Sequence, residues 1–78
     1  MDASKIYETL DKYQIDHLLY LVRRAQHATD HEVGWNKSAA KHENLFLRIG
    51  LIRETHSDSA YFVVTELGQE VAKIASVN

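Results

Sequence analysis

The 78-residue sequence contains no cysteine and no proline, and only three glycines and one tryptophan. Without cysteine, the chain forms neither disulfides nor thiolate metal sites. No apolar run approaches the roughly 18 residues that a membrane-spanning helix requires, and no signal peptide is visible in residues 1–10. These absences favour one cytoplasmic domain over residues 1–78, with no membrane partner.

Patterns that would carry catalysis are also missing. The sequence has no glycine-rich phosphate loop, and no paired-carboxylate or Ser/His/Asp arrangement stands out, so we expect no enzyme activity and no cofactor. His27 and His31 are four residues apart, a spacing at which two helical imidazoles can hold a metal. Gly34 and the polar run around these histidines indicate that the helix ends near His27, which argues for surface or loop histidines and no metal site.

The most informative sequence patterns of the chain lie in residues 45–75. Leu45, Phe46 and Ile49 recur at helical spacing, and Gly50 can take the left-handed backbone that ends a helix. Residues 51–55 and 60–65 are rich in β-branched and aromatic side chains and predict two strands, joined by a four-residue loop at 56–59. Thr65 is a good cap for a closing helix over 66–76. Gly68, in the first turn of that helix, suggests close packing.

The run Arg48-Ile49-Gly50-Leu51-Ile52-Arg53 and the run from Tyr61 to Gly68 resemble the end of the recognition helix, the wing and the closing helix of bacterial winged-helix regulators. Multiple-antibiotic-resistance repressors and phenolic-acid repressors are the nearest in character. The resemblance covers residues 45–75 and implies a mainly α fold with a small β-hairpin, in the winged-helix-like order α-α-α-β-β-α. It also implies DNA binding and transcription regulation, although winged helices serve as protein-binding modules too.

Amphipathic periodicity predicts helices near 4–12, 15–28 and 37–49, the last capped by Asn36. The first two could be one bent helix, since no glycine or proline separates them. Residues 29–35 are too few for a positioning helix, so either 15–28 is that helix or the domain is a trimmed variant. The expected core comprises Leu18, Leu19, Val22, Leu45, Phe46, Ile49, Leu51, Val64, Leu67, Val71 and Ile74.

Charge favours a DNA-binding face on the third helix. The whole chain carries a net charge of −2, but residues 37–53 hold four basic residues against one acid, Glu43. Three- and four-residue spacing lets the polar side chains of this helix share an exposed face, lysines suiting phosphates and Asn44 an adenine edge. The expected contacts with double-stranded DNA are Lys37, Ser38, Lys41, Asn44, Arg48 and Arg53. Alternatively, these residues form only the solvated face of an amphipathic helix.

Apolar residues raise the question of a protein interface. The closing helix and the Ile6/Leu10 stripe offer more apolar face than so small a core can cover, which favours a homodimer. Both faces of the strand 60–65 are apolar, so a flanking helix or a second chain must cover one. Trp35 is expected to pack against helix three, or else to anchor a partner protein. The expected interface residues are Trp35, Ile74, Ala75 and Val77. The alternative function is a winged-helix-like interaction module, or a small phage or mobile-element inhibitor, that binds a protein instead of DNA.

Overall fold

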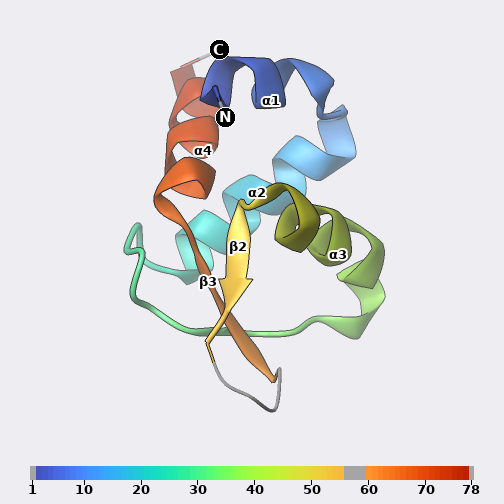
Figure 1. Cartoon of the computed structure of the whole chain (residues 1–78), viewed down its shortest axis with the longest axis vertical. Coiled ribbons are helices and arrows are strands. Elements are labelled where there is room, and N and C mark those ends of the chain that lie inside the picture. Colours follow the sequence, from blue (N-terminus) through green and yellow to red (C-terminus); the bar gives the residue numbers. More distant parts are fainter. Residues whose placement is uncertain (1, 56–59, 78) are drawn as a thin grey trace.

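The computed structural model describes residues 2–55 and 60–77 (Figure 1). In chain order they form α1 (Ala3–Thr9), α2 (Lys12–Arg24), β1 (Val33–Gly34), the 3-10 turn η1 (Lys37–Ala39), α3 (Ala40–Ile49), β2 (Ile52–Glu54), β3 (Tyr61–Val64) and α4 (Glu66–Val77). The expected fold class is confirmed: the chain is mainly helical with a small antiparallel sheet, and one helix closes it. The predicted 56–59 loop lies outside the described residues. Within the described ranges no helix is both long and apolar enough to cross a lipid bilayer.

The first two helices are separate, as predicted, which excludes the alternative of a single bent helix. The Asp11 side chain accepts from the Gln14 backbone N–H at 2.9 Å, and the Gln14 side chain accepts from the Asp11 N–H at 2.9 Å. This capping box starts α2 at Lys12, three residues before the predicted start. At the other end, Gln26 and His27 have φ values of 53° and 59°, which a helix does not allow, so α2 ends at Arg24.

The segment that was too short for a helix contains a strand instead. Val33 of β1 pairs with Phe62 of β3, and Gly34 pairs with Tyr61, which extends the predicted hairpin to three strands in the order β1-β3-β2. A strand and one 3-10 turn therefore separate α2 from α3. The connection is longer than the short turn of a typical helix-turn-helix.

The predicted helix stop at Gly50 is confirmed. Gly50 has a φ of 87°, in the left-handed region that costs a glycine nothing. The N–H of Leu51 then donates to the Phe46 carbonyl at 2.8 Å, satisfying one of the open carbonyls at the end of α3.

The predicted cap at Thr65 is confirmed too, and it ties two helices together. The Thr65 hydroxyl accepts from the Gly68 N–H at 3.1 Å and donates to the Gly50 carbonyl at 2.6 Å. The Thr65 N–H donates to the Leu51 carbonyl at 3.0 Å. The beginning of α4 is thereby fixed to the end of α3.

The core lies between the helices and one face of the sheet. Among the predicted core residues, those on the innermost faces are buried, namely Leu18, Val22, Phe46, Leu51, Val64 and Val71. Four others pack against them half-buried, namely Leu19, Leu45, Ile49 and Leu67. Ile74 is half-buried but is not part of this packing. The core also contains residues outside the predicted set, including Leu21, Ala25, Val33, Ile52, Phe62 and Ala72.

Two arguments for a second chain are corrected by this packing. Ile6 and Leu10 are buried, because α1 lies across α4 near the chain termini (Figure 1), so their stripe is not an exposed apolar face. Val63, on the opposite sheet face from Phe62 and Val64, is only 2% exposed, so the single chain covers it.

The close packing predicted at Gly68 can be tested with an alanine substitution, because helix propensity and packing predict opposite effects on stability. A Cβ atom at this position would clash with the Leu51 carbonyl oxygen and come within 2.7 Å of Val64 Cγ1. Helix propensity alone favours Gly68→Ala by about 1 kcal/mol. Because the clash involves backbone, we expect a net destabilisation of about 2 kcal/mol in urea unfolding.

Gly34→Ala is the matched control, since the nearest atom to its added Cβ would be Tyr61 Cε1 at 3.9 Å. We expect its stability to stay within about 0.5 kcal/mol of the parent. A stabilised Gly68→Ala variant would contradict the packing described here.

Candidate nucleic-acid interface

Of the polar residues that were expected on one face of helix three, those that lie on α3 share a face. Lys41, Asn44 and Arg48 are exposed on α3, and their three- and four-residue spacing places them within a narrow stripe. Lys37 and Ser38 are exposed on η1, which leads directly into α3. In Figure 1 this helix lies on the other side of β2 from α4.

Arg53 lies apart from that stripe, on strand β2. It follows buried Ile52, so its side chain belongs to the opposite face of the sheet, directly across from Val63. Exposed Glu54 is the next residue of the strand. The α3 stripe and Arg53 are therefore two separate basic elements.

The single acid of residues 37–53 does not oppose these cations at the surface. Glu43 is 0% exposed and lies on the inner side of α3 beside Phe46. Its Oε1 accepts from the backbone N–H of Asn36 at 3.0 Å, and its Oε2 lies 3.0 Å from His17 Nε2. The exposed stripe of α3 consequently carries Lys41 and Arg48 without a neighbouring carboxylate from its own helix.

This carboxylate–histidine pair connects α2 to α3, and the sequence analysis missed it. The His17 ring, whose side chain is 12% exposed, stacks at 6.0 Å on Phe46 and at 5.7 Å on Tyr20. His42 lies 5.7 Å from His17, and its Nδ1 is buried with no hydrogen-bond partner within the described ranges. The available signal was the spacing of Glu43 and Phe46, which puts both on the inner helical face.

Asn36 was predicted to cap a third helix over 37–49, but it caps the 3-10 turn η1, and α3 begins only at Ala40. The Asn36 Oδ1 accepts from the Ser38 N–H at 3.0 Å and from the Ser38 hydroxyl at 2.7 Å. The hydroxyl proton of Ser38 is thus used in the turn, which leaves its oxygen as an acceptor. Asn36 and Glu43 together fix η1 against α3.

Trp35 packs beside the sheet. It is half-buried, and its ring lies 4.9 Å from that of Phe62 at an interplanar angle of 53°. Its Nε1 is buried and lacks a hydrogen-bond partner in the part of the chain that the structure describes. Trp35 is thus packed and is not an exposed anchor, but its aromatic neighbour is Phe62 of β3, whereas helix three was the expected partner.

The other expected interface residues lie at the end of α4. Ile74 and Ala75 are half-buried and Val77 is 81% exposed. Ile74 and Val77 line a shallow hollow of about 450 Å³ together with Ala3, Glu70 and Lys73.

The two histidines that were considered as metal ligands are not on a helix. His27 follows the end of α2 with a left-handed backbone, and His31 is exposed in the segment before β1. Over residues 2–55 and 60–77, the His, Asp and Glu side chains form no cluster of three or more with metal-binding geometry.

No protein-family model, curated protein sequence or solved structure gives a significant match to this chain. The winged-helix resemblance over residues 45–75 stays a prediction.

The buried pair can be tested by removing His17, the less buried of its two members. His17→Ala leaves the Glu43 carboxylate buried with one hydrogen bond fewer, and breaking such a pair is costly. We expect a loss of about 3 kcal/mol in the free energy of unfolding, measured with urea. His31→Ala is the control, since His31 is exposed, and should change stability by less than about 0.5 kcal/mol. Equal stability of the two variants would contradict a structural role for the pair.

Proposed function

We propose that this chain is a small cytoplasmic winged-helix protein that binds duplex DNA and regulates transcription. The observation that carries the proposal is the asymmetry of α3. Its outer stripe holds Lys41, Asn44 and Arg48, while its single acid is buried and paired. A helix with such a face suits the major groove, where phosphates attract lysines and base edges offer hydrogen bonds.

Each residue has a role in this proposal. Lys37 and Lys41 contact phosphates, which fix the protein on the duplex without reading sequence. Asn44 reads an adenine edge, Arg48 extends the contact along the groove and Ser38 accepts a hydrogen bond beside it. Arg53 reaches the backbone from β2, on the hairpin that projects from the helical body in Figure 1.

Salt-titrated binding to mixed-sequence duplex DNA tests the proposal. Each replacement, Lys37→Ala or Lys41→Ala, should weaken binding to all sequences alike and lower the slope of log K against log[salt] by about one unit. Lys5→Ala removes the same charge from exposed α1 and should leave the slope unchanged. Absence of measurable affinity at low salt would exclude DNA binding.

Recognition of a base by Asn44 predicts a result different from that of the phosphate contacts. Asn44→Ala should relax the preference at one base pair by about 1–3 kcal/mol, with the salt slope unaltered. A binding-site selection with the parent and the variant measures this change. If the variant weakens binding equally on all sequences, Asn44 contacts the backbone and the proposed adenine contact is wrong.

We also propose that the chain works as a homodimer through the end of α4. Support comes from Val77, which is exposed, and from the shallow hollow lined by Ile74 and Ala3. Glu70 and Lys73 line the same hollow and carry opposite charges. In a two-fold symmetric interface a patch meets its own copy, so Glu70 of one chain can face Lys73 of the other.

Sedimentation equilibrium tests the dimer. Val77→Asp puts a charge on the proposed interface twice, once per chain, and should weaken dimerisation at least about hundredfold. Tyr13→Asp makes a comparable exchange at a 73% exposed position on α2 and should leave the dimer intact. A mass of 9.0 kDa at every concentration would rule the dimer out.

A protein partner is the second candidate, and exposed tyrosines favour it. Tyr13 and Tyr20 lie seven residues apart on α2, on one helical face, and are 73% and 37% exposed. Tyrosine is enriched at protein interfaces because it offers large contact area and a hydroxyl. This candidate predicts no duplex affinity at low salt, and full biological activity in a Lys37→Ala/Lys41→Ala double variant.

A further inference from the structure

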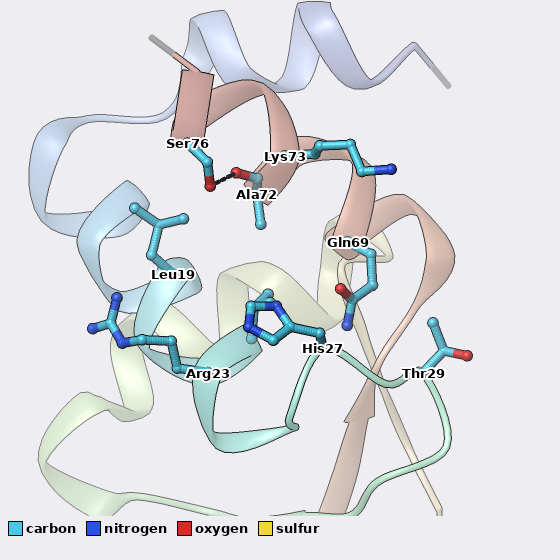
Figure 2. A pocket seen from close by; sticks show the side chains of 9 residues that line it. Leu19, Arg23, His27, Thr29, Gln69, Ala72, Lys73 and Ser76 are labelled. Carbon is cyan, nitrogen blue, oxygen red and sulfur yellow. Dashed lines mark hydrogen bonds between the residues drawn. The ribbon is translucent and has the colours of Figure 1, made fainter.

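A hollow lies between α2 and α4, away from the α3 stripe. It has a volume of about 600 Å³, within the range of small-molecule sites. Figure 2 shows Leu19 and Arg23 on the α2 side, Gln69, Ala72 and Lys73 on the α4 side, and the His27 ring between them. The remaining lining residues are Val22, Thr29 and Ser76.

The apolar part of this pocket is aliphatic. Leu19, Val22 and Ala72 supply it, and among the described lining residues there is no Phe, Tyr or Trp on which a ring would stack. The α4 wall from Gln69 to Ser76 extends for about 10 Å at 1.5 Å per residue. Such a slot accommodates a short hydrocarbon chain.

The charged side chains that line the pocket are both positive. Arg23 and Lys73 line it, and none of the described lining residues is acidic, although the chain as a whole carries −2. Neither side chain has a hydrogen bond or ion pair within residues 2–55 and 60–77. The Lys73 ammonium projects from the outer edge (Figure 2), and its flexible stem lets it turn toward a bound anion.

Local structure fixes the wall beside His27. The Gln69 Nε2 donates to the Ala28 carbonyl at 3.4 Å, which joins α4 to the chain just after α2. His27 itself has a φ of 59°, an uncommon backbone conformation for a residue with a side chain. The Gln69 Oε1 and the His27 ring nitrogens add polar atoms beside the aliphatic slot.

From this combination we infer that the pocket between α2 and α4 binds an aliphatic monocarboxylate. Its hydrocarbon chain lies along Leu19, Val22 and Ala72. Its carboxylate faces Arg23, and Lys73 at the opposite edge adds to the positive field. The inference is independent of DNA binding, since it uses none of the α3 residues.

Amide chemical shifts of the ¹⁵N-labelled chain, titrated with butanoate, hexanoate and octanoate, test the site. Affinity should rise with chain length, by about fifteenfold from butanoate to hexanoate if both added methylenes are buried. The shifted amides should lie in residues 19–29 and 69–76. Shifts elsewhere, no dependence on chain length, or no binding by any of the three would overturn the inference.

Charge is tested with matched probes and matched variants. Hexanoate should bind about fivefold more tightly than 1-hexanol, the upper range for a solvent-exposed ion pair. Arg23→Ala/Lys73→Ala should abolish that difference, because both cations are removed. Both replaced side chains are exposed, so the fold is retained. Lys5→Ala/Lys12→Ala removes the same charge outside the pocket and should preserve it.

A pocket-filling variant separates this site from binding at other surfaces. Ser76 is exposed and lines the slot, so Ser76→Phe should block hexanoate and 1-hexanol alike with the fold intact in the amide spectrum. Unchanged binding in this variant, or a hexanoate preference that survives in Arg23→Ala/Lys73→Ala, would refute the proposed site.

Discussion

The buried carboxylate of Glu43 is the constraint on which the arrangement of the helices depends. A charge removed from water is costly unless hydrogen bonds compensate it, and here the two compensating groups come from different parts of the chain. One is the backbone N–H of Asn36, before η1, and the other is the His17 ring on α2. The observed placement of α3 against α2 gives each oxygen of Glu43 a hydrogen-bond partner. The inward direction of Glu43 therefore also determines which face of α3 meets the solvent.

A second network holds the other end of α3. Gly50 ends the helix, and its carbonyl accepts from the Thr65 hydroxyl, which in turn caps α4 through the Gly68 N–H. Leu51 adds a hydrogen bond from its carbonyl to the Thr65 N–H. The hairpin thus leaves and re-enters the helical body at nearly the same point. With Glu43 near one end and Thr65 at the other, α3 is held at both ends, as a helix presenting a binding face requires.

Local sequence patterns predicted two of the helix ends in this fold, whereas the features that depend on long-range pairing were not predicted. The roles of Gly50 and Thr65 could be predicted because a helix end with left-handed backbone and a helix cap by a hydroxyl depend on neighbouring residues alone. The start of α2 was misplaced although Asp11 and Gln14 form a readable capping box. Strand β1 has two residues and exists only through its pairing with β3, which no local pattern reveals. Of the candidate site, the exposed stripe of α3 follows from helical spacing, whereas the burial of Glu43 depends on His17, 26 residues earlier.

Helix α2 serves both candidate sites with different faces. His17 points toward α3, whereas Leu19, Val22 and Arg23 lie about half a turn away around the helix and line the pocket with α4. The cations of the two sites are thereby kept apart, and exposed acids at Asp2, Glu8, Asp11 and Asp16 occupy α1 and the beginning of α2. The net charge of −2 is the sum over all regions of the chain. Since screening limits exposed charges to a range of about 10 Å, the field that a ligand meets at each site is set by the side chains of that site and not by the net charge.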